Sequence, residues 1–126
     1  GLSFHIHYFL LDILKNAMTL SPFPFSITDF NTIEPEIHTG ITGFAEWRII
    51  HRDDIRIRLV TYSSDYLADH WCDKGHIIFC AEGEMETELH NGEKHVLQKG
   101  QVYTVGDHSD AHRSYSKNGC TLFIVD

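Results

Sequence analysis

Turn-forming residues recur at short, regular intervals from residue 25 to residue 126, and this punctuation limits the fold more than any other feature. Glycine, asparagine, aspartate and serine supply most of it, at residues 39–40, 52–54, 63–65, 73–75, 82–83, 91–92, 99–100, 106–108 and 118–119. Short apolar or alternating runs lie between these turns, at residues 55–62, 76–80, 85–90, 93–98, 101–105 and 120–125. Many short strands without intervening helices are typical of a β-sandwich or a jelly-roll barrel. The spacing therefore predicts an all-β domain.

Asn91-Gly92 is the strongest local signal within this pattern. The dipeptide stands between two alternating runs, where it favours a type I′ turn because both of its residues tolerate positive φ. We therefore expect residues 85–90 and 93–98 to form a hairpin.

The first residues differ from the rest of the chain. Helix formers fill the stretch from Phe9 to Met18, and Pro22 and Pro24 would end a helix there. Two interpretations stay open. Residues 1–24 are a short helical extension that docks on the domain or on a partner subunit, or residues 1–17 lie upstream of a native start at Met18. In both cases residues 25–126 form one barrel domain.

Composition narrows the classes of function. The net charge of −8 argues against nucleic acid or an anionic membrane surface as the main partner. No apolar run is long enough to span a bilayer. The chain has 3 cysteines and no Cys-x-x-Cys pair, so a disulfide framework is not expected. A reducing compartment, and hence a cytoplasmic location, is the expectation.

Histidine and cysteine cluster around one predicted turn. If His70 and Cys72 lie on a strand, they point to the same face with Cα atoms roughly 6.6 Å apart. The connection Asp73-Lys74-Gly75 would return His76 on the neighbouring strand opposite Cys72, with Cβ atoms about 4.5–5.5 Å apart. With His112 these side chains form a candidate site for a transition metal ion. Zinc suits the donor set best, and iron, nickel or copper are alternatives.

Two glycine-anchored segments resemble the motifs of the cupin superfamily. The first cupin motif runs Gly, His-x-His, three or four residues, Glu, six residues, Gly, and here His70-x-Cys72, three residues, His76, six residues, Gly83 has its spacing. The second runs Gly, five residues, Pro-x-Gly, two residues, His. Its counterpart here is Gly100, five residues, residues 106–108 and then His112, with one additional residue.

The chain departs from these motifs at specific positions. Cys72 stands where the second histidine is expected, His76 stands where the glutamate is expected, and Gly106 replaces the proline. The string Asp69-His70-Trp71-Cys72 resembles the small group of DHCW-motif cupin-fold proteins. The resemblance covers residues 25–126 and implies a cupin-type double-stranded β-helix, a jelly-roll barrel. The changed ligands weaken any transfer of activity from the cupin enzymes.

Several residues are expected beside the metal site. Asp69 either orients a ligand histidine or is a solvated carboxylate. If the barrel closes as in cupins, Tyr103, His108 and Ser114 flank the site and line a ligand pocket. A neighbouring strand carries Arg56 and Arg58, which either pair with glutamates at residues 86 and 88 or bind a carboxylate at the barrel mouth.

Two functions stay open at this point. One is a metal-dependent enzyme acting on a small polar or anionic molecule. The other is a non-catalytic module that binds or senses a metal or ligand. The sequence has no clear general-base motif, so this second function stays an alternative to the enzyme. Outward apolar residues, Trp71, Ile77 and Phe79, predict a homodimer.

Overall fold

The computed structural model describes residues 19–126. The helix predicted between Phe9 and Met18, and the alternative start at Met18, lie outside the described residues. Residues 19–29 contain neither helix nor strand, and a short 3-10 helix, Phe30–Thr32, follows them. Within residues 19–126, no helix is both long enough and apolar enough to cross a membrane.

The rest of the described chain is built of β-strands, which confirms the all-β prediction. The strands are β1 (Glu36–Thr39), β2 (Phe44–Arg52), β3 (Ile55–Tyr62), β4 (Tyr66–Leu67), β5 (His76–Leu89), β6 (Lys94–Gln98), β7 (Val102–Val105), β8 (His112–Ser116) and β9 (Cys120–Val125). Every pairing between them is antiparallel.

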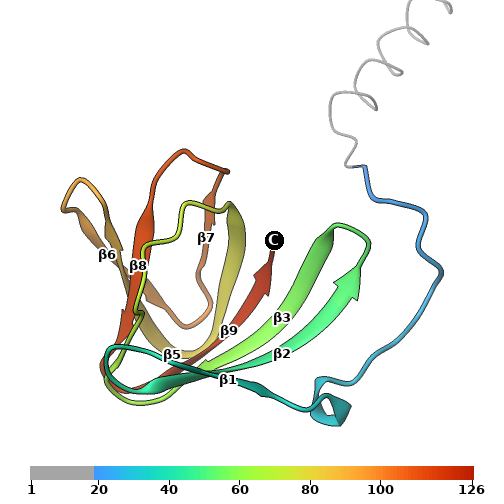
Figure 1. Ribbon diagram of the computed structural model, residues 1–126, viewed down its shortest axis with the longest axis horizontal. Coiled ribbons are helices and arrows are strands. Elements are labelled where there is room, and N and C mark those ends of the chain that lie inside the picture. Colours follow the sequence, from blue (N-terminus) through green and yellow to red (C-terminus); the bar gives the residue numbers. More distant parts are fainter. Residues whose placement is uncertain (1–18) are drawn as a thin grey trace, which may run out of the picture.

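The strands form two sheets that share β5. The first sheet has the order β1-β2-β3-β9-β5-β7, and the second has the order β4-β8-β5-β6. Figure 1 shows the two sheets curling around a common interior, with β9 lying between β3 and β5. This is the expected jelly-roll arrangement, and it puts alternate residues of each strand inside.

β5 replaces the two separate strands predicted at residues 76–80 and 85–90. Its register shifts between Cys80 and Glu82, and Gly83 follows at φ 73°. A Cβ added at Gly83 would lie 2.5 Å from the carbonyl oxygen of Gly119, so only glycine fits there. The glycine thus bends one long strand from the first sheet into the second, where a turn had been expected.

The hairpin between β5 and β6 forms as predicted, but its turn type differs. The amide of Gly92 donates to the carbonyl of Leu89, at 2.9 Å, and the amide of Leu89 donates to the carbonyl of Glu93, at 2.8 Å. Gly92 has φ 95°, whereas Asn91 is not among the residues with positive φ. The loop is therefore a three-residue turn ending in a left-handed glycine, and the type I′ prediction was wrong.

The inward face of the first sheet changes from apolar to polar along the strands. Its layers, read across β3, β9 and β5, are Val60–Leu122–Cys80, then Arg58–Ile124–Ile78, then Arg56–Asp126–His76. The first layer belongs to the fully buried core. The last layer carries an arginine, an aspartate and a histidine, and it borders the candidate site.

Candidate functional site

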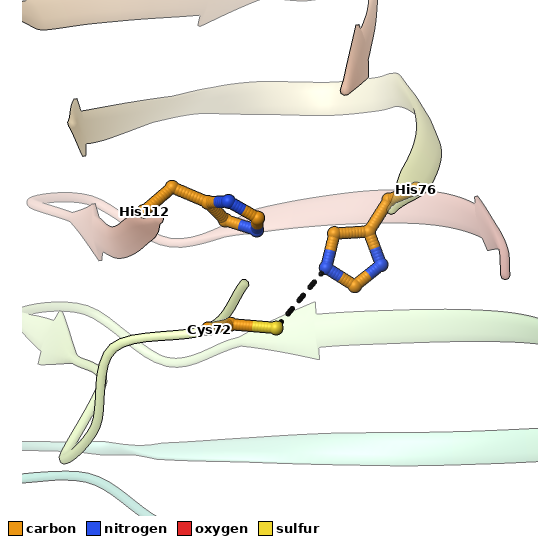
Figure 2. Close-up of side chains that lie close together, drawn as sticks. All are labelled: Cys72, His76 and His112. Carbon is orange, nitrogen blue, oxygen red and sulfur yellow. Dashed lines mark hydrogen bonds between the residues drawn. The ribbon is translucent and has the colours of Figure 1, made fainter. Parts of the chain in front are cut away.

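Three potential metal donors converge inside the barrel. Cys72 Sγ and one ring nitrogen each of His76 and His112 all lie within 4.8 Å of one another. Figure 2 shows the three side chains pointing toward one another, and Cys72 Sγ lies 3.4 Å from His76 Nε2. His76 begins β5, His112 begins β8, and Cys72 lies in the loop between β4 and β5.

The loop reaches this position by a route that sequence reasoning did not foresee. Cys72 pairs with His112 as an isolated bridge, and each amide donates to the other residue's carbonyl at 2.8 Å. The predicted backbone pairing of Cys72 opposite His76 was therefore wrong. The loop bonds to the backbone of β8 at Ala68 and at Cys72 but forms no strand of its own, so the same-face argument for His70 and Cys72 does not apply.

His70 stays apart from the three converging donors. Its ring Nδ1 lies 2.6 Å from Asp69 Oδ1, and both side chains are exposed. The hydrogen bond with His70 lowers the pKa of Asp69. His70 nevertheless lines the same cavity as Cys72, His76 and His112. Asp69 thus contacts a histidine, but one that lies at the edge of the site.

A buried aspartate orients His76. Asp126 Oδ2 lies 2.8 Å from His76 Nδ1, and the aspartate side chain is fully buried. Arg56 donates to Asp126 at 2.9 and 3.2 Å, and Arg58 donates to it at 2.7 Å. Burial alone would raise the pKa of Asp126, but the hydrogen bonds from His76 and Arg56 and the two guanidinium charges hold that pKa far below its usual range.

These contacts fix the tautomers of both histidines. An ionised Asp126 can only accept, so His76 Nδ1 carries a proton, and Nε2 is the ring nitrogen that faces Cys72. His112 Nδ1 lies 2.9 Å from the carbonyl oxygen of Asp110, which assigns its proton in the same way. His112 Nε2 is then buried without a hydrogen-bond partner. Burial, and next the neighbouring His76, lower the pKa of His112, which keeps its ring neutral.

The donor set fits a transition metal ion. Leaving a buried nitrogen such as His112 Nε2 without a partner costs free energy, and a metal ion bound to that nitrogen would remove the cost. Tetrahedral zinc, with Zn–S near 2.3 Å and Zn–N near 2.1 Å, places sulfur and nitrogen about 3.6 Å apart. The observed separation of Cys72 Sγ from His76 Nε2 is 3.4 Å.

The remaining predicted pocket residues divide into two groups. Tyr103 and Ser114 line the cavity beside the donors. The Tyr103 hydroxyl is buried, and burial raises the pKa of this phenol to about 12. His108 does not line this cavity. Its backbone has φ 58°, its amide donates to the carbonyl of Asp73 at 2.8 Å, and its exposed ring lies 2.9 Å from the Asp73 carboxylate.

The cavity beside the donors measures about 130 Å³. Arg56 and Arg58 line it, and their partner is Asp126 rather than Glu86 or Glu88. The two glutamates lie instead near cationic side chains outside this layer, Lys94 for both and Arg113 for Glu88. The predicted pairing with Glu86 and Glu88 was therefore wrong, and the other alternative, a carboxylate-binding pair at the barrel mouth, stays a prediction.

Sequence reasoning missed Asp126. A signal for it was present, because Cys120, Leu122, Ile124 and Asp126 alternate along one face of the last strand. An acidic residue that continues an inward apolar series must find partners inside the barrel. That rule would have predicted a buried carboxylate near the end of β9.

No protein-family model and no curated protein matches the chain. Solved structures do. Protein NMB1881 from Neisseria meningitidis is 28% identical, with a TM-score of 0.52 over 63% of this chain and 79% of that chain. Ectoine synthase from P. lautus is 16% identical, with a TM-score of 0.65 over 80% of this chain and 76% of that chain.

A third solved structure carries the family name. An RmlC-like cupin from Shewanella frigidimarina is 17% identical, with a TM-score of 0.58 over 84% of this chain and 89% of that chain. At this identity the likeness speaks for the fold. It agrees with the antiparallel jelly roll described above. The chain is a protein of the cupin fold.

Proposed function

We propose that this cupin binds one transition metal ion, zinc in the first instance, through Cys72 Sγ, His76 Nε2 and His112 Nε2. The observation that carries the proposal is the convergence of these three atoms within 4.8 Å, with one of the two nitrogens buried and otherwise unpartnered. Thiolate and neutral imidazole are donors that zinc prefers, and copper, nickel and iron accept the same set.

Three protein donors leave one position of a tetrahedral ion for water or for a small molecule. The adjoining cavity of about 130 Å³ gives that molecule room. An open position is what catalytic metal sites have, and a bound ion would polarise an oxygen of the ligand there. Tyr103, protonated at neutral pH because burial raises its pKa to about 12, could donate a hydrogen bond to such an oxygen.

The second candidate is a module that binds its ligand without transforming it. One observation favours it: among the described residues that line the cavity, none carries a carboxylate. Asp126 is fully engaged by His76, Arg56 and Arg58, and its depressed pKa makes it a poor base. A reaction that needs a carboxylate as general base therefore has no candidate among the residues that line the cavity.

Metal analysis of the purified full chain tests the proposal. Protein made with zinc supplementation, without a metal-chelating column, should contain close to one ion per chain. Cys72→Ser and His112→Gln should lose most of it, because a hydroxyl or an amide is a far poorer ligand. His108→Gln, a change at an exposed histidine outside the cavity, is the matched control and should keep it. Metal-free wild-type protein under these conditions would overturn the proposal.

X-ray absorption on the zinc-loaded protein shows whether the fourth metal position is open or is filled by a protein ligand. One sulfur, two imidazoles and one light exogenous atom would support an open site. A third imidazole in place of that atom would identify His70 as a fourth ligand and favour the closed, non-catalytic site. His70 is the residue to consider because it also lines the cavity.

The barrel of residues 25–126 is the unit to which we assign this function, and a homodimer is its proposed assembly. The outer face of the first sheet exposes Ile77, Phe79 and Phe123, and Phe79 pairs directly with Phe123. Clustered apolar side chains on a sheet face are typical of an interface. Sedimentation of the full chain at micromolar concentration should show a dimer that Phe79→Ser dissociates. A wild-type monomer would contradict this assembly.

The location proposed for the protein follows from the thiol. All 3 cysteines are free, and Cys72 must remain reduced to act as a donor. A reducing compartment such as the cytoplasm would keep it so.

A further inference from the structure

The cavity beside the donor cluster is cationic in a chain whose net charge is −8. Arg56 and Arg58 line it from β3, and one carboxylate, that of Asp126, is shared between them. Two guanidinium groups against one carboxylate leave a surplus of one positive charge. A divalent ion bound by a Cys72 thiolate would add another. Buried surplus charge is unfavourable unless an anion joins it.

Arg58 is the arginine with unused hydrogen-bonding capacity. Its side chain is 5% exposed, its Nη2 donates to Asp126 at 2.7 Å, and its guanidinium lies 4.6 Å from the centre of the Trp47 ring. Its Nε is buried and makes no hydrogen bond within the protein. Burial lowers the pKa of Arg58, yet a guanidinium keeps its charge, so an unpaired N–H here is costly.

A third arginine in the lining does not add to this surplus. The guanidinium of Arg113 lies 4.9 Å from the centre of the Trp71 ring, and its Nη2 lies 3.4 Å from a Glu88 carboxylate oxygen. Its charge is therefore balanced by Glu88 of β5, beside the Trp71 ring. Arg56 and Arg58 remain as the source of positive charge for the cavity.

The size of the cavity limits what can bind. Its volume is about 130 Å³. A dry protein cavity of about 150 Å³ accepts benzene, so the part of a ligand that lies inside this cavity has about six non-hydrogen atoms or fewer. A ligand must also reach the open metal position while it neutralises the arginines. Two contacts, one N–H donor and one metal position, match the two oxygens of one carboxylate group.

We propose that the ligand of this site is a small monocarboxylate, held between the metal ion and the guanidinium of Arg58. This inference rests on the proposed metal site, which supplies the second contact. It assigns Arg58 the role of recognising the negative charge, while Asp126 and Arg56 hold its side chain in place.

Calorimetric titration of the zinc-loaded full chain tests the inference. The probes are pyruvate and its neutral amide, pyruvamide, which have the same number of non-hydrogen atoms. Pyruvate should bind roughly tenfold or more tightly than pyruvamide, because hydrogen bonds to a charged group are the stronger ones. Arg58→Gln should abolish that preference while the zinc content stays near one per chain. Arg52→Gln, at an arginine that bonds Ser26 instead, is the matched control and should preserve the preference.

Arg58→Lys guards against a folding defect in Arg58→Gln, because it keeps the positive charge beside Asp126 but has no Nε. It should bind pyruvate more weakly than wild type and still fold. Equal binding of pyruvate and pyruvamide by zinc-loaded wild type would overturn the inference and leave the metal site standing. Tighter binding of sulfate than of pyruvate would also overturn it. Binding of pyruvate that depends on Arg58 in protein that takes up no zinc would overturn the metal proposal instead.

Discussion

Two histidine–aspartate pairs of this barrel have nearly the same length and lie in opposite surroundings. His76 Nδ1 is 2.8 Å from Asp126, and their side chains are 8% and 0% exposed. His108 Nδ1 is 2.9 Å from Asp73, and their side chains are 78% and 63% exposed. Both histidines looked like site residues in the sequence. The difference teaches that burial, rather than contact distance, decides which pair can hold an imidazole in one orientation.

The surroundings also set opposite electrostatic effects. In the exposed pair, the hydrogen bond and charge of Asp73 raise the pKa of His108, which favours its protonated form. Inside the barrel, burial lowers the pKa of His112, which favours the neutral form that a metal needs. Acid therefore acts in opposite directions on the two regions.

The largest effect is expected from the buried pair. Asp126→Asn removes the carboxylate but leaves Arg56 and Arg58 in place, so the free energy of unfolding should fall by about 3–5 kcal/mol. Zinc affinity should fall roughly 10–100-fold because His76 loses the partner that orients it. Urea unfolding and zinc titration measure the two quantities. Asp73→Asn, the same change in the exposed pair, is the control, and equal losses in both variants would break the comparison.

Acidification of the metal-free protein should produce the next largest effect. The folded state holds the pKa of His112 below 6.5 and that of Asp126 below 3.8, so the unfolded chain binds more protons at both sites. Stability is therefore fully present above about pH 6.5 and declines as the pH falls through that value, and again below 3.8. Urea midpoints over a pH series in chelator will show this. Stability that rises on acidification from neutral pH would contradict it.

A smaller effect is expected at the edge of the site. His70→Ala removes an exposed ring that contacts Asp69 and lies outside the converging donors. Zinc affinity should remain close to that of wild type, whereas His76→Ala should lose most of it. Competition with a colorimetric chelator measures both. A loss in His70→Ala as large as that in His76→Ala would make His70 a ligand and close the open position.

The smallest effect is expected from the exposed pair. His108→Gln should change neither the zinc content nor the thermal midpoint at neutral pH, because solvent screens its contact with Asp73. What stability the pair does contribute has the opposite pH dependence. It is present below the ordinary pKa of 6.5 and is lost as the pH rises through the raised pKa of His108. A thermal midpoint of His108→Gln well below that of wild type at neutral pH would show that the exposed pair contributes to stability despite its exposure.

The sequence was most informative where turn residues and alternation agreed. Residues 55–62 and 120–125 are β3 and β9 with the predicted bounds. It was less informative where a glycine had two possible uses, as at Gly83, which bends β5 instead of ending it. Whether a glycine ends or bends a strand depends on the opposing backbone, here Gly119, which no local pattern reveals.

The candidate site was also predictable only in part, because local patterns do not show which distant segments meet. Local spacing joined His70, Cys72 and His76 in one hypothesis, and the resemblance to the second cupin motif supported adding His112. The structure places the donor atoms of Cys72, His76 and His112 together, without that of His70. The spacing could not separate His76 from His108, because both are histidines next to predicted turns. Their burial depends on which loops pack against which strands, as does the contact of Asp126 with a histidine 50 positions earlier.

The position of β9 bears on the order in which the barrel assembles. β9 comes last in sequence among the strands but lies in the middle of the first sheet, between β3 and β5. Closing that sheet requires contacts between residues distant in the chain, which slow folding. Cys72 and His76, 4 positions apart, can meet early, whereas Asp126 reaches His76 only when β9 inserts. Two donors of the proposed metal site can thus meet before the carboxylate that orients His76 arrives with β9.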